Sequence, residues 1–176
     1  MEGKQGSVPE RRIRPAVFGD AEALAELETR IWRSAYRELL PQSLLDGLSE
    51  DHKAELWRKY LCEGITTFVL EEGARVLGFA GCGPAREPLN ELPASEIYAI
   101  YLDDSLWGQG HGRALYERCR AELLEQGPQA LVVWVLRQNR RARDFYERQG
   151  MVLEGSQKQE HLLGHPLPQV RYTLPT

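Results

Sequence analysis

Three glycines alternate with polar residues in the segment WGQGHGR, at Gly108, Gly110 and Gly112. Glycine permits backbone conformations with positive φ and lets a ligand approach without meeting a side chain. Consecutive amides before a helix point at one spot, and the helix dipole favours negative charge there, so the expected guest is a phosphate or pyrophosphate. The G-x-G-x-G spacing matches neither the dinucleotide fingerprint nor the Walker loop, and a plain turn between strand and helix is the alternative.

The glycine segment is expected to join a buried strand to an amphipathic helix. The run from Ile97 to Leu102 is apolar and aromatic, as in a largely buried strand, and residues 103–105 end it with turn chemistry. Downstream, Leu115, Cys119 and Leu123 recur at four-residue spacing, which is typical of a helix with one buried face. The rest of the chain is organised around this strand–loop–helix unit.

Hydrophobic periodicity and turn residues predict the other elements. Strands are expected at 12–16, 66–71, 75–82, 97–102, 130–136, 151–160 and 169–173, and helices at 21–40, 44–48, 49–64, 113–126 and 139–150. Residues 161–168 are expected to form a loop. The main order β-α-α-β-β-β-α-β-α-β-β, without internal repeat or linker, indicates a single α/β domain with a mixed sheet of about seven strands.

Composition and charge argue against several classes of protein. A net charge of −4 gives no support to binding of nucleic acid or anionic membrane, and no apolar stretch approaches the roughly 18 residues that cross a bilayer. Residues 1–10 lack the apolar core of a secretory signal and are expected to be a disordered tail before a domain spanning 11–176. Cys62, Cys82 and Cys119 are odd in number and widely spaced, which is typical of reduced thiols in the cytoplasm.

The segment WGQGHGRAL after a strand, followed by a second strand and by FYERQG, resembles the GNAT superfamily of acetyl-CoA-dependent N-acetyltransferases. The family signature Q/R-x-x-G-x-G/A is matched at Gly110 and Gly112, whereas Trp107 replaces its first Gln or Arg. The family holds the CoA pyrophosphate chiefly through backbone amides, so this replacement threatens binding little. The resemblance covers the chain from Ile13 to about Tyr172.

The resemblance implies a GNAT-like fold, with a mostly antiparallel sheet, helices on both faces, and fourth and fifth strands that splay apart around the pantetheine arm. It also implies that backbone groups of the central strand bind pantetheine and the thioester oxygen. The cofactor-binding residues that it implies are Ile100, Leu102, Trp107, Gly108, Gln109, Gly110, His111, Gly112, Arg113, Asn139 and Tyr146.

The same resemblance makes Tyr146 the candidate acid. In the family, the tyrosine of F-Y-x-x-x-G lies beside the CoA sulfur, and FYERQG carries it without deviation. A phenol with a pKa near 10 is protonated at neutral pH and can protonate a thiol leaving group with a pKa near 8.5. The alternative for Tyr146 is a half-buried core residue. Asn139 reaches pantetheine or the tyrosine by resemblance, and a helix cap is its alternative.

Glu96 is the candidate general base. Histone-type members of the family have a glutamate at the corresponding strand position, and strict alternation would put Glu96, Tyr98, Ile100 and Leu102 on one face. Because only about 0.1% of a primary amine is neutral at pH 7, a carboxylate or a chain of waters would assist the attack. The alternative is a solvated residue at the start of the strand.

Aromatic residues are the candidates for an acceptor pocket. Trp32, Tyr36, Trp57 and Tyr60 from the first half of the chain could line it, together with Tyr98 from the central strand. Packing of the helices on the sheet is an equally good interpretation for the first four.

The resulting prediction is a cytoplasmic N-acetyltransferase that uses acetyl-CoA and a small-molecule or peptide amine, with no nucleic-acid or membrane partner. The alternative is a non-catalytic acyl-CoA-binding or sensing module. The oligomeric state is left open, a homodimer included. The four histidines have no metal-ligand spacing, and no Ser-His-Asp or paired-cysteine motif is visible, so no metal is expected.

Overall fold

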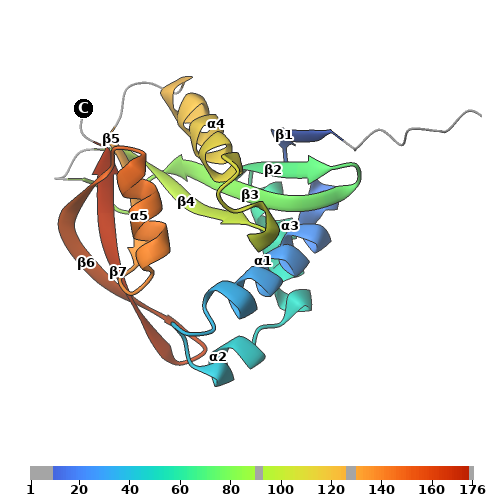
Figure 1. The fold of residues 1–176 in the computed structure, drawn as a ribbon, viewed down its shortest axis with the longest axis horizontal. Helices are drawn as coiled ribbons and strands as arrows, with labels where there is room; N and C mark the ends of the chain where they lie inside the picture. The colour runs from blue at the N-terminus through green and yellow to red at the C-terminus, as the bar shows by residue number, and fades with distance from the viewer. Residues whose placement is uncertain (1–9, 90–92, 126–129, 175–176) are drawn as a thin grey trace, which may run out of the picture.

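The computed structural model describes residues 10–89, 93–125 and 130–174. The tail predicted at 1–10 lies outside these ranges apart from Glu10. The elements run in this order (Figure 1): β1 (Arg11–Pro15), a 3-10 turn (Phe18–Asp20), α1 (Ala21–Ala35), α2 (Gln42–Asp46), α3 (Glu50–Cys62), β2 (Thr66–Glu72), β3 (Arg75–Pro84), β4 (Ala94–Leu102), a 3-10 turn (Asp104–Leu106), α4 (His111–Glu125), β5 (Ala130–Leu136), α5 (Arg140–Arg148), β6 (Val152–Leu162) and β7 (His165–Leu174).

The seven strands of the described chain form one sheet in the order β1-β2-β3-β4-β5-β7-β6. Every neighbouring pair is antiparallel except β4 and β5, which are parallel. Their pairing runs only from Ala94 opposite Ala130 to Glu96 opposite Val132, and beyond it the two strands diverge. The predicted α/β fold with splayed fourth and fifth strands is therefore confirmed.

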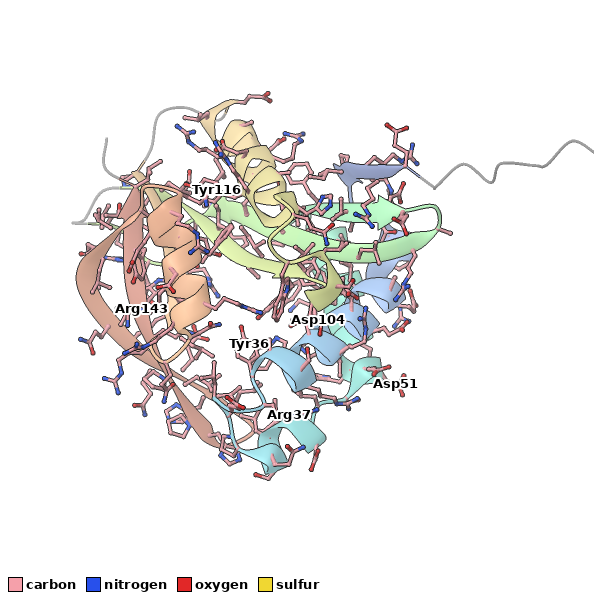
Figure 2. All side chains as sticks on the ribbon, in the orientation of Figure 1. Tyr36, Arg37, Asp51, Asp104, Tyr116 and Arg143 are labelled. Carbon is pink, nitrogen blue, oxygen red and sulfur yellow. The ribbon has the colours of Figure 1, made fainter. Side chains whose placement is uncertain are left out.

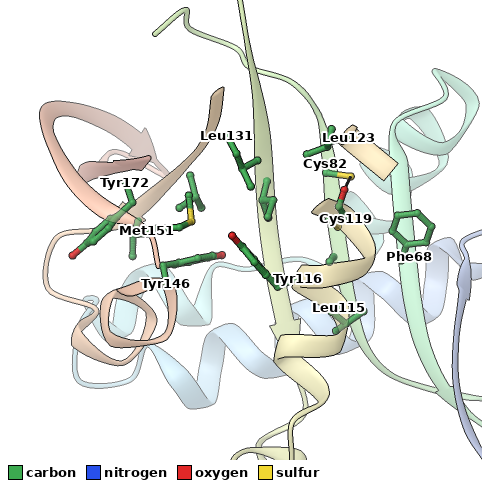
Figure 3. Packing of buried hydrophobic residues seen from close by; sticks show 14 of the residues in the cluster. Phe68, Cys82, Leu115, Tyr116, Cys119, Leu123, Leu131, Tyr146, Met151 and Tyr172 are labelled. Carbon is green, nitrogen blue, oxygen red and sulfur yellow. Dashed lines mark hydrogen bonds between the residues drawn. The ribbon is translucent and has the colours of Figure 1, made fainter. Parts of the chain in front are cut away.

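Helices cover both faces of the sheet (Figure 1). On one face, α1 and α3 pack on the sheet through a cluster that includes Leu24, Ile31 and Phe79. On the other face, α4 and α5 share a core with β4, β5 and β7 (Figure 3), in which Leu115 and Tyr172 are fully buried. A third cluster joins the end of α1 and the helix α2 to Leu136 at the end of β5 and to Leu167 near the start of β7.

A bulge at Tyr98 changes which side chains of β4 share a face. The register with β3 shifts there, since Ile97 lies opposite Cys82 and Ala99 lies opposite Gly81. Ile97 and Ile100 therefore pack with α4, whereas Ala99 packs with α1 and α3. The prediction that strict alternation would put Glu96 and Ile100 on one face is wrong, because an extra residue reverses the alternation.

The loop predicted at 161–168 is instead a tight hairpin. β6 extends to Leu162 and β7 begins at His165, and the two turn residues, Leu163 and Gly164, have φ of 49° and 78°. Positive φ at both positions is the mark of a type I′ turn, whose twist suits a hairpin. Pro166 and Pro168 fit within β7 because β7 pairs with β5 only from Gln169 onward, so both prolines occupy an open edge.

Helix ends fix the segments that carry the site. The side chain of Ser49 accepts a hydrogen bond from the His52 N–H and caps α3, and the Asn139 side chain accepts from the Ala142 N–H and caps α5. Asp20 precedes α1 but its side chain does not cap the helix, because this carboxylate binds Arg14 and the Val17 N–H instead. In the part of the chain that is described, no helix is both long and apolar enough to span a membrane.

Candidate active site

Two cavities meet where β4 and β5 diverge. We call them the aromatic cavity, of about 570 Å³, and the loop cavity, of about 330 Å³. The residues that line both, called the junction here, are Tyr36, Ile100, Tyr101, Asn139, Ala142 and Tyr146. Because these residues come from the end of α1, from β4 and from α5, ligands in the two cavities would meet at the junction.

The glycine segment forms the far end of the loop cavity. Gly108 and Gly110 have φ of 74° and 87°, a conformation that other residues rarely adopt. Gly112 lies in α4, and its lack of a side chain lets the Phe145 ring pack close to the helix, since an added Cβ would lie 3.4 Å from that ring. The Ala114 N–H donates to the Gly110 carbonyl, so the amides of residues 111–113 are the unpaired first turn of α4. This arrangement fits an anionic group such as a pyrophosphate.

The side chains of Gln109 and His111 point elsewhere. Arg11 of β1 approaches Gln109 Oε1 at 3.4 Å and His111 Nε2 at 3.3 Å, and Gln109 also donates to the Ser105 carbonyl. Neither residue lines the loop cavity. Their predicted part in binding would therefore rest on their backbone amides.

Trp107 is held as a wall of the loop cavity. Its indole N–H donates to the Leu102 carbonyl at 3.0 Å, and the Arg141 guanidinium lies 3.3 Å from its ring centroid. Arg141 was missed by the sequence analysis, although its place in the first turn of the helix after Asn139 could have suggested it. Arg113 and Arg148 line the same cavity, so its walls carry three cations.

β4 supplies the wall between the two ends. Ile100 and Leu102, whose backbone groups are predicted to bind the coenzyme, line the loop cavity. β4 pairs with β5 only as far as Glu96. Beyond this residue, the edge of β4 that faces β5 is not paired with β5. Such an edge can bind the amides of an extended ligand as an added strand would.

Tyr146 is buried at the junction, with 6% of its surface exposed, and it lines both cavities. Burial raises the pKa of its phenol well above the ordinary value of 10. Figure 3 shows its hydroxyl directed towards that of Tyr116 on α4, which is itself buried without a hydrogen-bond partner among the described residues. Tyr146 therefore stays protonated at neutral and mildly alkaline pH.

Tyr36 and Trp32 are two of the aromatic residues predicted to line an acceptor pocket. Both line the aromatic cavity, with their rings in edge contact at 4.9 Å, and Tyr36 also reaches the loop cavity. Figure 2 shows Tyr36 projecting from the end of α1. Burial raises the pKa of its phenol, and Tyr101 and Asn139 are its polar neighbours.

Tyr98 lines the aromatic cavity, but Glu96 lines neither cavity. The Glu96 carboxylate is fully buried and accepts hydrogen bonds from the backbone N–H and the guanidinium of Arg86. Arg86 in turn lies over the Tyr98 ring, 5.3 Å from its centroid, and faces the cavity. The structure thus places Arg86, rather than Glu96, at the wall.

Glu28 is a carboxylate of the aromatic cavity that the sequence analysis missed. It accepts hydrogen bonds from Lys53 Nζ at 2.7 Å and from the Trp57 indole N–H at 2.9 Å. Its signal in the sequence was spacing, since Glu28, Trp32 and Tyr36 are four residues apart and lie on one face of α1. Among the described residues, no group of three or more acidic, histidine or cysteine side chains is placed to hold a metal ion.

The site thus combines a glycine loop at a helix N-terminus, a free strand edge and a buried tyrosine between two cavities. A model of the acetyltransferase (GNAT) family matches residues 22–151. The chain is 34% identical to the uncharacterized N-acetyltransferase YuaI of Bacillus subtilis over 127 residues, which cover 72% of each chain. The chain therefore belongs to the acetyltransferase (GNAT) family, and the prediction of an N-acetyltransferase is confirmed at that level.

One further relative and two solved structures are more distant. A probable N-acetyltransferase of Mycobacterium tuberculosis is 26% identical over 93% of this chain and 92% of its own. The PaiA N-acetyltransferase of Thermoplasma acidophilum, solved with coenzyme A, has a TM-score of 0.73 at 17% identity over 92% of this chain and 98% of its own. The putative acetyltransferase YncA of Salmonella typhimurium, solved with acetyl-CoA, has a TM-score of 0.68 at 21% identity, covering 94% and 93%. These two structures share the fold.

Proposed function

We propose that this protein transfers an acetyl group from acetyl-CoA to a primary amine by direct attack in a ternary complex. The observation that carries the proposal is the position of Tyr146, whose phenol lines both cavities at their meeting point. The amine nitrogen attacks the thioester carbon, the C–S bond breaks, and Tyr146 protonates the departing thiolate. Burial keeps this phenol protonated, so its proton is available to the thiolate, and the proton that the amine releases to water then restores the phenol.

Acetyl-CoA fits the loop cavity by charge and shape. The unpaired amides of residues 111–113, with Arg113 and Arg141 nearby, suit the pyrophosphate, and the free edge of β4 suits the amides of pantetheine. Two structural neighbours were crystallised with CoA or acetyl-CoA, which supports the same assignment. In this placement the thioester would reach the junction.

We propose that water takes the proton of the amine. The prediction of Glu96 as base stays untested, but its carboxylate is bound by Arg86 and faces neither cavity, which favours the other option of a water chain. The proposed setting is the cytoplasm, in keeping with three unpaired cysteines, and the proposed acceptor is a small-molecule or peptide amine.

The test is release of CoA thiol with a panel of amines by wild-type protein and Tyr146→Phe. We expect kcat to fall on the order of 100-fold or more while the KM for acetyl-CoA changes little, because the phenol acts on the leaving group. Tyr60→Phe, a phenol at the rim of the aromatic cavity, is the matched control and should keep kcat within about twofold of wild type. If acetyl-CoA binds and no amine gives thiol release that depends on Tyr146, the alternative of a non-catalytic acyl-CoA-binding module is correct.

A further inference from the structure

Each charge that lines the aromatic cavity already has a partner within the protein. Glu28 binds Lys53 and the Trp57 indole. Arg86 binds the buried Glu96 behind it. Because the carboxylate of Glu28 is engaged twice, the cavity offers no free anion at that end to a second ammonium group on an acceptor.

The carboxylate on the β6 side is engaged in the same way. Glu160 lies 3.1 Å from Lys158 Nζ and also accepts from the Gln169 side chain at 3.5 Å. Glu160 and Arg86 both line the cavity, and each is close enough to influence the other electrostatically. The lining charges, two positive and two negative, therefore compensate one another.

Nine aromatic residues of the described chain line the cavity beside these charges. They are Trp32, Tyr36, Trp57, Tyr60, Phe79, Tyr98, Tyr101, Trp134 and Tyr146. Several ring faces already hold a cation of the protein, at 5.1 Å for Lys53 over Trp32, 5.3 Å for Arg86 over Tyr98 and 4.5 Å for Lys158 over Trp134. A second cation on the acceptor would meet these charges, whereas an uncharged apolar body would displace water from the rings.

Resting on the function proposed above, we propose that the acceptor is a primary amine on an uncharged aromatic body, an arylalkylamine, and not a polyamine. The reactive amine would lie at the junction beside Tyr36 and Tyr146, and the ring would extend between Trp32 and Trp134. A volume of about 570 Å³ accommodates a one- or two-ring amine and lies in the range of small-molecule sites. A second ammonium would lose hydration there without gaining a free carboxylate.

The test compares amines that differ only at the far end from the reactive nitrogen. We expect kcat/KM for 2-phenylethylamine to exceed that for butylamine by about tenfold or more, and that for 1,4-diaminobutane to fall below butylamine. Tryptamine tests the two-ring limit and should match or exceed 2-phenylethylamine. The proposal is overturned if 1,4-diaminobutane or spermidine is used as well as 2-phenylethylamine.

A charge variant gives a second, independent result. Lys53→Met removes the ammonium from Glu28 and frees one oxygen of its carboxylate in the cavity, while Trp57 still binds the other, so kcat/KM for 1,4-diaminobutane should rise about tenfold relative to butylamine. Lys59→Met, on the same helix but outside the cavity and exposed, is the control and should leave the ratio unchanged. No change of the ratio in Lys53→Met would contradict the assigned role of the Glu28–Lys53 pair, provided that the melting temperature shows a folded variant.

The two proposals fail in different ways. If amines other than arylalkylamines are acetylated as well as or better than 2-phenylethylamine in a Tyr146-dependent manner, the proposed function stands and the acceptor class is wrong. If no amine is acetylated, the function fails, and calorimetric titration of the CoA-saturated protein then decides on the cavity. In that experiment 2-phenylethylamine should bind at least tenfold more tightly than 1,4-diaminobutane, and equal or reversed affinities would overturn the acceptor class.

Discussion

The buried carboxylate of Glu96 shows how a single side chain can be redirected by its neighbour. Its two oxygens accept from the backbone N–H and from the guanidinium of Arg86, and none of its surface is exposed. Arg86 packs on Tyr98 and lines the aromatic cavity. We infer that Glu96 acts as a positioning residue, because it holds the cavity wall without reaching the reacting atoms.

Glu96→Gln is therefore expected to affect acceptor binding and stability more than chemistry. The amide keeps the hydrogen bond from the Arg86 N–H but loses the ion pair, so stability should fall by about 1–3 kcal/mol and the acceptor KM should rise several-fold. The pH dependence of kcat should keep its shape, because no base is removed. Arg86→Gln is the matched variant and should raise the acceptor KM in the same way. A kcat that falls 100-fold or more in Glu96→Gln alone, with a flattened acidic limb, would identify Glu96 as the base.

At the scale of residues, the sequence revealed groups whose role is tied to a local motif. Tyr146 and Asn139 lie at fixed positions relative to a helix start, so the motif located them at the junction. Glu28 and Arg141 act through partners on other elements, namely Lys53 and the Trp107 ring. Those pairings depend on tertiary contacts, which a one-dimensional pattern does not contain.

At the scale of elements, the bulge in β4 and the glycines of β3 together position the Tyr98 side chain. The Tyr98 ring crosses β3 and its hydroxyl donates to the Pro84 carbonyl at 2.7 Å. A Cβ added at Gly83 would lie 2.6 Å from that hydroxyl, whereas one added at Gly81 would meet only ordinary contacts at 3.9 Å. The space above Gly83 therefore determines how Tyr98 enters the wall of the aromatic cavity.

Gly83→Ala should displace Tyr98 from its place against β3. Because the ring would lose its hydrogen bond to Pro84 and move towards the cavity, we expect a several-fold higher acceptor KM and a loss of about 1–3 kcal/mol in stability. Gly81→Ala is the control, and its stability should stay within about 1 kcal/mol of wild type. Steady-state kinetics and thermal unfolding measure both effects. Equal behaviour of the two variants would refute the steric role of Gly83.

Element order was predictable because periodicity is a local property of the chain. The β2–β3 hairpin and the apolar β5 appear near their predicted bounds. The bulge at Tyr98 and the β6–β7 hairpin were not predicted, for two physical reasons. Strand register depends on the partner strand, and prolines are tolerated at an open strand edge that the sequence alone does not reveal.

At the scale of the whole molecule, a network around Arg171 links β7, β6 and the segment before β4. Only 5% of Arg171 is exposed, and its guanidinium binds the Glu154 carboxylate at 3.0 and 3.2 Å, the Ser156 hydroxyl at 3.0 Å and the Pro88 carbonyl at 3.0 Å. The same guanidinium lies 5.3 Å from the centroid of the Trp134 ring in the aromatic cavity. The outer strands are thereby tied electrostatically to the wall of the aromatic cavity.

This network should set part of the stability of the protein in acid. Hydrogen bonds from Arg171 lower the pKa of Glu154 from its ordinary 4.5 to about 2. A carboxyl with a lowered pKa in the folded state stabilises the fold above pH 4.5, and that contribution disappears as pH falls from about 4.5 to about 2. Glu154→Gln removes the titrating group, so the variant should be less stable than wild type at pH 7 by on the order of 1 kcal/mol after allowance for solvent screening.

The difference in stability between wild type and Glu154→Gln should shrink as pH falls from about 4.5 to about 2, since protonated glutamate and glutamine are then similar. Urea unfolding between pH 7 and pH 3 measures this difference, with Glu55→Gln, whose side chain is exposed on α3, as a control that should show no such convergence. Because Arg171 also faces Trp134, we expect the acceptor KM of Glu154→Gln to rise at pH 7 while the KM for acetyl-CoA is unchanged. A stability difference that is constant with pH would mean that the Arg171–Glu154 pair does not couple this end of the sheet to protonation.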